Sequence, residues 1–488
     1  MDTIPQIRIT KANSSPVNRD GDYVLYWMTS YRRVTWNYSL DRAVYWSERL
    51  NRPLVILEAL RCGYDWASDR IHRFILDGMA DNARQLEKKR CLYYPYVETH
   101  PDSDKGLLET LGRKACMVVT DDFPAFFLPR MISSASKKMP VLLEQVDSNG
   151  LLPMRLTDRA FPTAYSFRRF LQKNLPSYIL DHPSPAPLNN LKTHRLPSLP
   201  KEIMKRWPPA SSFLLRGDAK ELRALPINHG VTVIDKRGGS LQARHILRRF
   251  VDNRLDHYIG DRNHPDMEGT SNLSPYLHFG HLSAHEIFHR VIEKESWLPG
   301  KLDDNSRGKK SGWWGMRASA EAFLDQLITW RELGFNMCLN RKDYDQYESL
   351  PDWAKKTLKA HELDERDYIY ELETLEEAST HDPLWNAAQR QILREGRLHN
   401  YLRMLWGKKI LEWSSTPREA LRAMIHLNNR YALDGRDPNS YSGIFWVLGR
   451  YDRAWGPERS VFGKIRYMSS KNTLKKVRVK EYIKKYSG

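Results

Sequence analysis

The sequence predicts an α/β domain with a Rossmann-like parallel sheet, followed by an all-α domain. Its 488 residues exceed the usual size of one hydrophobic core, so two domains are expected. Short β-rich runs alternate with helical patterns as far as about residue 150, and the pattern is helical from about residue 239 onward. We therefore expect an α/β domain over 20–150, a connector over 151–238 and a helical domain over 239–488.

Five runs in the first domain have the composition of strands: 23–28, 53–60, 91–97, 117–121 and 140–146. Amphipathic stretches separate them, which is the rhythm of a parallel sheet with crossover helices. The segment after the first strand, residues 28–33, reads MTSYRR and lacks the glycines of a dinucleotide-binding fingerprint. The domain could therefore hold a ligand or serve as a scaffold.

Proline, serine and leucine dominate residues 183–209, a composition that favours an extended connector. Long amphipathic segments follow at 241–257, 320–339, 386–412 and 417–429. The second domain is therefore predicted to be almost entirely helical.

Charge points to a polyanionic partner. Lys and Arg number 77 against 59 acidic residues, a net charge of +18, which favours nucleic acid ahead of an anionic membrane surface. A generally basic protein that binds neither is the alternative, since charge alone says nothing about clustering.

The cysteines and the apolar runs indicate whether the protein binds metal or a membrane and where in the cell it is found. The four cysteines form no close pair of the kind that binds metal, so no metal site is expected. No stretch approaches the ~18 apolar residues of a membrane span, and residues 1–20 are polar. We expect a soluble intracellular protein in the cytoplasm, the nucleoid or a nucleus, a monomer without an obligate protein partner or a membrane.

Tryptophan spacing suggests an electron-transfer row. Trp406 and Trp413 are two helical turns apart and would share one helix face, and a neighbouring helix could bring Trp385 beside them. Electrons could hop along such indoles. Ordinary aromatic packing is the alternative, and spacing alone favours it.

Five segments resemble class II cyclobutane-pyrimidine-dimer (CPD) photolyases of the photolyase/cryptochrome family. They are TSNLSPYLHFG at 270–280, HDPLWNAAQ at 381–389, LHNYLRMLWGKKILEW at 398–413, NNRYALDGRDPN at 428–439 and RAWGPERSVFGKIRYM at 453–468. The resemblance is close from about residue 252 to the end and weak in the first third. It implies light-driven repair of DNA that contains pyrimidine dimers.

The resemblance also implies FAD as cofactor, active in its reduced anionic form. The residues that would hold its diphosphate and sugar side are Tyr258, Thr270, Ser271, Asn272, Leu273 and Ser274. A loop that leads into a helix suits a diphosphate, because helix N-termini attract anions, although a plain helix cap also contains Ser and Thr.

Further positions match the family's flavin-ring site. Asn428 would face the redox-active ring nitrogen, and Arg403 and Asp434 would form an ion pair beside the ring, where a buried cation favours the anionic reduced flavin. An ordinary interhelical salt bridge is the alternative for that pair. Trp406, Trp385 and Trp413 would be the reducing chain, from proximal to distal.

Recognition of damaged DNA should combine phosphate contacts with a pocket for the extruded lesion. Trp330 and Trp446 match the aromatic walls of that pocket, and Arg262 matches a DNA-contacting position. Lys464 and Arg466 are further candidates, for which a solvated surface charge is the alternative.

Two departures from the family pattern matter. Gln326 stands where the family carries a glutamate that hydrogen-bonds the dimer, and a glutamine cannot supply an acidic proton. Residues 29–37, TSYRRVTWN, depart from a family motif, so the identity of any antenna chromophore stays open. Gln326 keeps two rival hypotheses in view: a cryptochrome-like blue-light photoreceptor, and a photolyase with altered lesion specificity.

Overall fold

The computed structural model describes residues 4–189, 191–305 and 307–488, which form two compact units. Unit 1 comprises Met1–Thr157, Leu175–Arg248 and Leu273–Val291. Unit 2 comprises Asp158–Asn174, Arg249–Asn272 and Ile292–Gly488. Each unit therefore takes its residues from three separate stretches of the chain.

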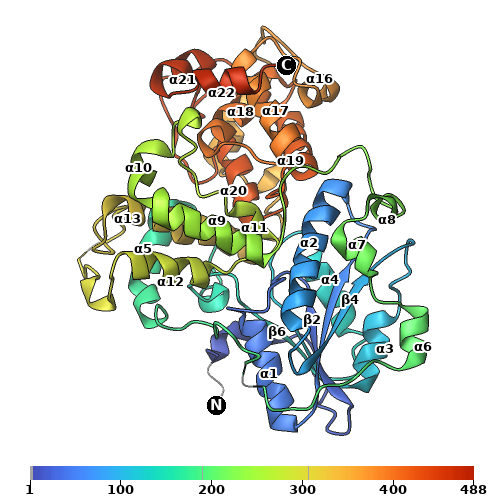
Figure 1. Ribbon diagram of the computed structural model, residues 1–488. Helices are drawn as coiled ribbons and strands as arrows, with labels where there is room; N and C mark the ends of the chain where they lie inside the picture. Colours follow the sequence, from blue (N-terminus) through green and yellow to red (C-terminus); the bar gives the residue numbers. More distant parts are fainter. Residues whose placement is uncertain (1–3, 190, 306) are drawn as a thin grey trace. The chain divides into compact units, whose positions relative to one another are not determined.

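Unit 1 is built on a six-stranded sheet with the order β1-β6-β5-β2-β3-β4 (Figure 1). The strands are β1 (Ile9–Lys11), β2 (Tyr23–Met28), β3 (Leu54–Leu60), β4 (Cys91–Val97), β5 (Ala115–Asp121) and β6 (Leu143–Val146). β2 to β6 are parallel, whereas β1 pairs antiparallel with β6 at the edge. The predicted α/β fold is confirmed, with an antiparallel edge strand that the sequence did not indicate.

Both faces of the sheet are buried, which explains why its strands are continuous apolar runs. Every residue of β2 is buried, and its side chains alternate between two hydrophobic cores, one on each face. Residues of α1 (Tyr38–Leu50) and α2 (Asp69–Leu86) contribute to one core, and residues of α3 (Leu107–Lys114), α4 (Leu128–Ser136) and α6 (Lys201–Arg206) contribute to the other.

The segment after β2 is held by a carboxylate of the protein itself. Asp121, at the end of β5, accepts the backbone N–H groups of Thr29, Ser30 and Tyr31 at 2.8–2.9 Å. It also accepts the hydroxyl of Tyr26 at 2.8 Å. In dinucleotide-binding folds the N–H groups of this turn bind phosphate, whereas here they are already occupied.

Most of the predicted connector contains short helices and belongs to unit 1, whereas its residues 158–174 belong to unit 2. Residues 175–248 include α6, α7 (Ser212–Arg216), α8 (Ala219–Arg223) and most of α9 (Ser240–Asn253). Unit 1 also contains α11 (Ser274–His278) and most of α12 (Ala284–Lys294). The boundary between the two units therefore does not fall at a single point in the sequence. It is defined by which stretches of the chain contact each other.

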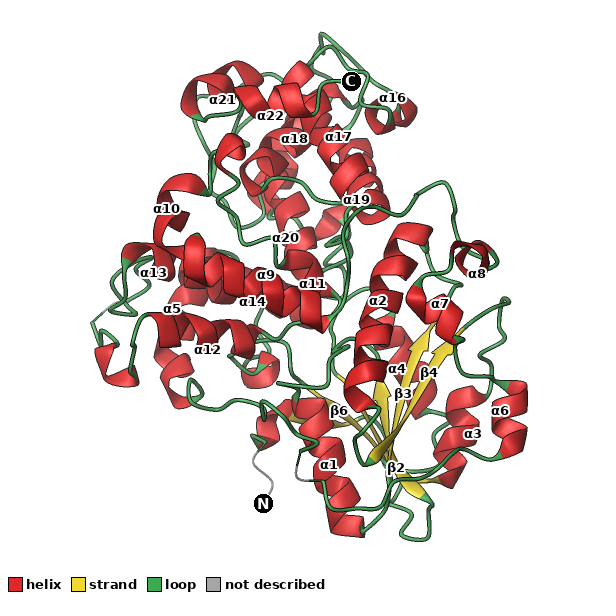
Figure 2. Ribbon diagram, in the orientation of Figure 1, coloured by secondary structure: helices red, strands yellow, loops and turns green. Residues whose placement is uncertain are grey.

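The named elements of unit 2 are helical (Figure 2). They include α5 (Ala164–Asn174), α10 (Tyr258–Asp261), α13 (Ala318–Leu324), a π-helical turn (Asp325–Trp330), α14 (Arg331–Asn340), α15 (Asp352–Ala360), α16 (Leu372–Glu376), α17 (Pro383–Glu395), α18 (Asn400–Trp413), α19 (Pro417–Tyr431), α20 (Pro438–Val447), α21 (Ser470–Lys476) and α22 (Lys480–Lys485).

Two predicted helical segments are interrupted. Residues 386–412 form α17 and α18, because Gly396 caps α17 in the left-handed conformation with φ 62°. Residues 320–339 contain the π-helical turn between α13 and α14. Both interruptions lie in segments that carry predicted site residues.

Gly407 allows α18 to pack closely against its neighbours. A Cβ atom at this position would lie 2.5 Å from Cγ2 of Val447 on α20 and 3.0 Å from Sδ of Met424 on α19. The absence of a side chain therefore sets the separation of these helices, next to the buried Trp406.

Candidate functional site

The three tryptophans of the predicted row lie together in unit 2. Trp385 on α17 donates its indole N–H to the Trp406 carbonyl oxygen at 3.0 Å. The ring centroids of Trp385 and Trp413 are 5.5 Å apart in an edge-to-face arrangement. All three side chains are buried, at 2% exposure or less. The rings of Trp385 and Trp413 are thus in contact, and Trp406 is joined to Trp385 through its backbone carbonyl oxygen.

Arg403, Asn428 and Asp434 form one polar cluster. Arg403 pairs with the carboxylate of Asp434 at 3.2 Å and donates to Oδ1 of Asn428 at 2.8 Å. Asn428 donates in turn to the Ser440 hydroxyl at 2.8 Å. The cluster therefore holds both the oxygen and the nitrogen of the Asn428 amide. Arg403 itself lies one helical turn before Trp406 on α18.

Two buried donors near these residues are unsatisfied. Gln389 is fully buried and accepts the indole N–H of Trp406 at 2.9 Å, while its Nε2 has no partner among the described residues. Nε1 of Trp446 is likewise buried and without a partner in the described part of the chain. Buried donors are normally paired, so both atoms fit a bound group rich in hydrogen-bond acceptors.

Gln326 and Trp330 lie on the π-helical turn. Asp325, at its start, is anchored to α5 by two hydrogen bonds from Arg168, at 2.9 and 3.2 Å. The Gln326 side chain is partly exposed and makes no hydrogen bond to the described residues. Such turns often mark functional sites, because the extra residue turns side chains away from the regular helical pattern.

Trp330 and Trp446 stack directly on each other. Their ring centroids are 4.6 Å apart and their planes 17° from parallel. This is the spacing of a contacting aromatic pair, so no base fits between the rings in this conformation. Both indoles are partly exposed. They form one stacked aromatic pair, instead of two separate walls.

The predicted diphosphate loop is divided between the units. Tyr258, Thr270, Ser271 and Asn272 belong to unit 2, and Leu273 and Ser274 belong to unit 1. Tyr258 is buried against Phe323, with ring centroids 5.4 Å apart, and burial raises the pKa of its hydroxyl. α11, which begins at Ser274, is only five residues long.

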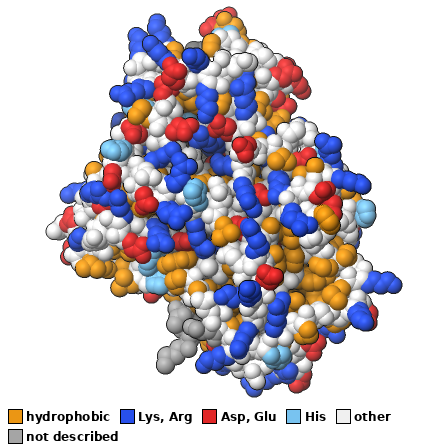
Figure 3. Space-filling model, viewed as in Figure 1, with side chains coloured by type: hydrophobic (Ala, Val, Ile, Leu, Met, Phe, Trp, Pro, Cys, Tyr) orange, Lys and Arg blue, Asp and Glu red, His pale blue; other side chains and the backbone are white. Residues whose placement is uncertain are grey.

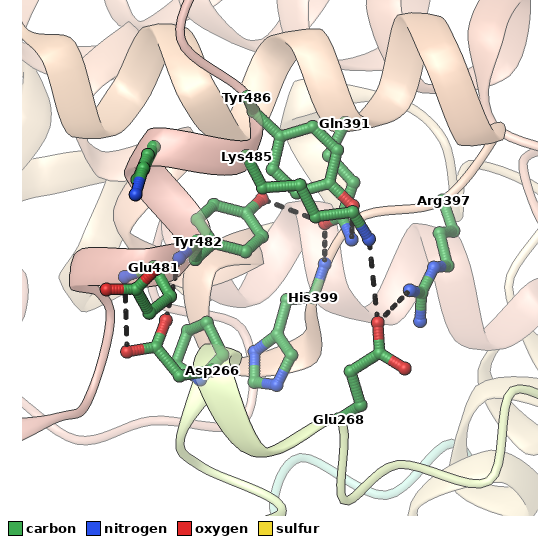
Figure 4. A pocket seen from close by; sticks show the side chains of 11 residues that line it. Asp266, Glu268, Gln391, Arg397, His399, Glu481, Tyr482, Lys485 and Tyr486 are labelled. Carbon is green, nitrogen blue, oxygen red and sulfur yellow. Dashed lines mark hydrogen bonds and ion pairs between the residues drawn. The ribbon is translucent and has the colours of Figure 1, made fainter.

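A cavity of about 440 Å³ lies beside this loop in unit 2 (Figure 4). Residues of the 265–268 segment, of the α17–α18 connection and of α22 line it. Oε1 of Gln391 accepts the Tyr482 hydroxyl at 2.8 Å and the His399 backbone N–H at 2.9 Å. Arg397 donates to Oδ1 of Asn272 at 2.5 Å. The cavity wall is thus bonded to the predicted cofactor loop.

Two cations that line this cavity, Arg397 and Lys485, pair with the same carboxylate. Glu395 accepts from Arg397 at 2.7 Å and from Lys485 at 3.1 Å. Burial opposes ionisation of Glu395, but the Tyr486 hydroxyl and Arg397 outweigh it and lower its pKa to about 2. His399 is 5% exposed, and burial lowers its pKa to about 4. Neither ring nitrogen of His399 has a partner among the described residues.

The three predicted DNA-contacting cations lie in different local surroundings. Arg262 ends α10, with its guanidinium carbon 5.5 Å from the Tyr258 ring centroid. Lys464 is exposed and pairs with Glu458 at 3.3 Å, and Arg466 lies over the Trp455 ring at 4.9 Å. Figure 3 shows Lys and Arg side chains over much of the face in view.

Four residues of this region were not predicted from the sequence: Gln389, Gln391, Arg397 and His399. All belong to or adjoin the quoted motifs at 381–389 and 398–413. Their position in the motifs was available as a signal, but the polar groups that they leave unpaired are a property of the folded chain.

Three curated relatives cover nearly the whole chain, and each is named deoxyribodipyrimidine photo-lyase. The protein of Methanothermobacter thermautotrophicus is 32% identical over 482 residues, which span 99% of this chain and 98% of that protein. The Arabidopsis thaliana protein is 32% identical over 98% of this chain and 92% of its own length. The Potorous tridactylus protein is 31% identical over 95% of this chain and 81% of its own length.

The comparison with solved structures agrees on the fold. The crystal structure of a class III photolyase from Agrobacterium tumefaciens matches 96% of this chain and 86% of its own, with a TM-score of 0.66 and 16% identity. No family model matches the chain.

Residues 4–189, 191–305 and 307–488 contain neither a metal-binding cluster nor a helix that could span a membrane. No group of three His, Cys, Asp or Glu side chains there could hold a metal ion. None of the helices formed by these residues has the length and apolar character needed to cross a membrane.

The relatives that cover nearly the full length of the chain lead to one assignment. The chain belongs to the deoxyribodipyrimidine photo-lyase family.

Proposed function

We propose that this protein is a light-driven DNA repair enzyme that splits cyclobutane pyrimidine dimers, and that it is of class II. Family membership over the full length carries the proposal. The class II assignment rests on the motifs at 270–280, 381–389, 398–413, 428–439 and 453–468.

FAD is the proposed cofactor, and in its reduced, excited form it would supply the electron that opens the dimer. Tyr258 and the loop from Thr270 to Ser274 would hold its diphosphate and sugar. Arg403, Asn428 and Asp434 would face its ring, and the unpaired Nε2 of Gln389 would donate to a ring acceptor. The Arg403 cation favours a negative charge there, because opposite charges stabilise each other most in a partly buried setting.

The tryptophan row would keep the cofactor reduced. Trp406 lies beside the Arg403 cluster on α18, Trp385 is bonded to its carbonyl, and Trp413 contacts Trp385. Electrons would therefore move inward from Trp413 through Trp385 to Trp406.

Trp330 and Trp446 are the proposed aromatic surface for the lesion. An extruded dimer would stack on the exposed side of the pair or separate the two rings, and Nε1 of Trp446 would then donate to a base carbonyl. Gln326, which lies on the same π-helical turn as Trp330 and makes no side-chain hydrogen bond to the described residues, would contact the bases. Its amide can donate and accept but holds no acidic proton.

DNA is the proposed partner, through its phosphates. The net charge of +18 supplies a general attraction, and Arg262, Lys464 and Arg466 are the proposed contacts. An antenna chromophore in unit 1 would have to bind without the N–H groups that follow β2, because Asp121 occupies them.

Survival of ultraviolet-irradiated cells tests the proposal. A bacterial strain without its own photolyase would express this chain and be exposed after irradiation either to blue light or to darkness. We expect rescue in the light alone, and loss of rescue with the Arg403→Ala variant. Absence of rescue by a protein that is produced in soluble form and carries flavin would overturn repair and favour a photoreceptor.

Gln326 supports a second candidate, a photolyase with a different lesion preference. Repair assays with two defined lesions, a cyclobutane dimer and a (6-4) photoproduct, separate the two candidates. The proposed function requires the cyclobutane dimer to be repaired faster, and the reverse order would favour the second candidate.

A further inference from the structure

The aromatic row continues beyond Trp413 to the surface. Tyr370 contacts Trp413 edge to face with ring centroids 5.4 Å apart, and its backbone N–H donates to the Trp413 carbonyl oxygen at 3.1 Å. His381 contacts Trp413 at 5.2 Å and stacks on Tyr368 at 3.8 Å. Trp413 is 2% exposed and Tyr368 is 47% exposed. Contacting rings therefore lead from the interior to solvent.

Tyr370 and His381 are arranged for coupled loss of an electron and a proton. The Tyr370 hydroxyl lies 2.7 Å from Nδ1 of His381. The same oxygen accepts the backbone N–H of His381 at 3.1 Å, which directs the phenol proton to Nδ1. A phenol gives up an electron much more readily when a base accepts its proton in the same step.

The surroundings of Trp413 stabilise a positive charge on its ring less well than the surroundings of Tyr370 and His381 do. The indole is buried, and Nζ of Lys409 lies 5.4 Å from its ring centroid. Glu412 offsets that cation in part, with an ion pair at 2.7 Å. Electron transfer from Tyr370, with its proton passing to His381, would move the positive charge to the exposed His381, where water and carboxylates stabilise it.

The surface around this exit differs in charge from the chain as a whole. Residues 362–377 carry eight acidic side chains and one basic one, Arg366, in a protein of net charge +18. Three of its apolar side chains are exposed: Leu363 at 98%, Tyr368 at 47% and Ile369 at 55%. In Figure 3 acidic side chains gather over α16, which lies in this segment.

We propose that residues 362–377 form an electron-entry surface, at which a positively charged reductant delivers electrons through Tyr370 and His381 to Trp413. The proposal rests on the proposed role of the tryptophan row. Carboxylates concentrate cations near the surface and repel anions, DNA phosphates included. The exposed apolar side chains offer a contact from which water is easily displaced.

The reaction at this surface has two steps. Trp413, oxidised by one electron, regains an electron from Tyr370, while the phenol proton passes to Nδ1 of His381. The products are neutral Trp413, a neutral Tyr370 radical and a protonated His381. A thiol then gives one electron to Tyr370 and releases its own proton to water, while His381 returns the phenol proton. The resulting thiyl radical pairs with a second one as a disulfide.

Flash illumination of the oxidised flavoprotein with two thiols tests the proposal. Cysteamine carries a positive charge and thioglycolate a negative one. Transient absorption would follow the lifetime of the aromatic radical. We expect cysteamine to shorten that lifetime on the order of tenfold more than thioglycolate at low ionic strength. The advantage should shrink at about 0.5 M salt, because the charges are then screened within a few ångströms.

Charge variants identify the surface. The double variant Glu365→Lys with Asp367→Lys should lose the cysteamine advantage. The matched control, Glu87→Lys with Glu202→Lys, changes exposed acids of unit 1 by the same charge and should keep it. Equal loss in both would mean that net charge alone governs the rate, and would overturn the assignment of the surface.

Ring variants identify the route. Tyr370→Phe should leave the radical on Trp413 and abolish the tyrosyl signal, whereas Tyr368→Phe, which removes a hydroxyl not bonded to His381, should not. His381→Asn keeps a hydrogen-bond acceptor without a base and should also suppress the tyrosyl signal. A tyrosyl radical that survives Tyr370→Phe would refute the route.

Different results would refute the tryptophan row and the electron-entry surface. If no aromatic radical forms in the wild-type protein, the proposed tryptophan row fails and this inference fails with it. If the radical forms but the two thiols act equally at every salt concentration, the electron-entry surface alone is refuted.

Discussion

Gln326 is the residue at which the sequence motifs predict the largest departure from the chemistry of the family. Its side chain lies on the π-helical turn, partly exposed and without a hydrogen bond to the described residues. A carboxylic acid there could donate a proton to the dimer as it gains an electron, whereas an amide offers only a neutral hydrogen bond.

We therefore expect Gln326→Glu to increase the rate of dimer splitting per absorbed photon. Splitting by pre-reduced protein on a defined thymine-dimer oligonucleotide would measure the rate. Gln346→Glu adds the same charge elsewhere in unit 2 and serves as control. An unchanged or lower rate in Gln326→Glu would mean that this position does not limit the reaction.

Trp406 is expected to matter for activation and not for repair itself. Trp406→Phe should slow photoreduction of the oxidised flavin by at least an order of magnitude, because phenylalanine is far harder to oxidise. Repair by chemically pre-reduced protein should stay close to wild type. Trp297→Phe, which removes another buried indole of unit 2, is the control. Loss of both activities in Trp406→Phe would argue against the row.

At the residue scale the sequence indicated which side chains meet, but not how their polar atoms are satisfied. Motif positions brought Arg403, Asn428 and Asp434 into one prediction, and the structure places them in one cluster. The unpaired nitrogens of Gln389 and His399 could not be foreseen, because a missing partner depends on every neighbour in the fold.

Secondary-structure elements position the site through their ends. α17 begins at Asp382, whose side chain accepts the backbone N–H groups of Leu384 and Trp385 at 3.0 and 3.1 Å. This cap fixes the turn that carries the middle tryptophan of the row. The capping carboxylate is therefore part of what places Trp385 beside Trp406.

Asp382→Ala should cost about 1 kcal/mol of helix stability, because two N–H groups lose their acceptor. For a unit of this size that lowers the thermal midpoint by about 2–4 °C. Asp382→Asn should leave the midpoint nearly unchanged, since asparagine caps equally well. Scanning calorimetry would measure both variants, and equal midpoints for Ala and Asn would rule out a capping role.

Element prediction succeeded where periodicity is strong. The runs at 23–28 and 91–97 are strands with those bounds, because both faces of the sheet are buried. β1 has three residues and no apolar pattern. The π-helical turn adds one residue to a turn, which hardly alters the spacing of apolar residues. Within 386–412, Gly396 is a glycine of the kind that commonly ends a helix, and α17 does end there.

The molecule as a whole divides by contacts that the sequence order conceals. Leu175–Arg248 and Leu273–Val291 belong to unit 1, although the helical pattern of residues 239–488 is continuous. The strand and helix patterns predicted the fold class and the composition predicted a basic protein, but neither predicted these returns of the chain to unit 1. Contacts between residues far apart in the sequence determine these returns, and such contacts cannot be predicted from local sequence patterns.

Several buried histidines make the stability of the molecule depend on pH. Burial lowers the pKa of His281 to about 3 and that of His72 to about 4, and it holds the pKa of His285 well below 6.5. The unfolded chain therefore binds more protons below pH 6.5, so these groups reduce stability as the pH falls. Asp41 acts in the opposite direction, because burial raises its pKa to about 7.

His285→Leu isolates one of these groups. We expect the thermal midpoint of this variant to fall less than that of wild type between pH 7 and pH 5, whatever its value at pH 7. His100→Leu, at an exposed histidine, should follow wild type. Parallel pH profiles for His285→Leu and wild type would show that His285 does not titrate on unfolding.

Light-dependent splitting by the purified protein tests the central claim most directly. The protein, with its flavin reduced beforehand, would be mixed with an oligonucleotide that carries one thymine dimer, and base absorbance would be followed under blue light and in darkness. The account predicts recovery of base absorbance in the light alone, with unmodified thymines as the product. A flavin-bearing protein that leaves the dimer intact after prolonged illumination would contradict it.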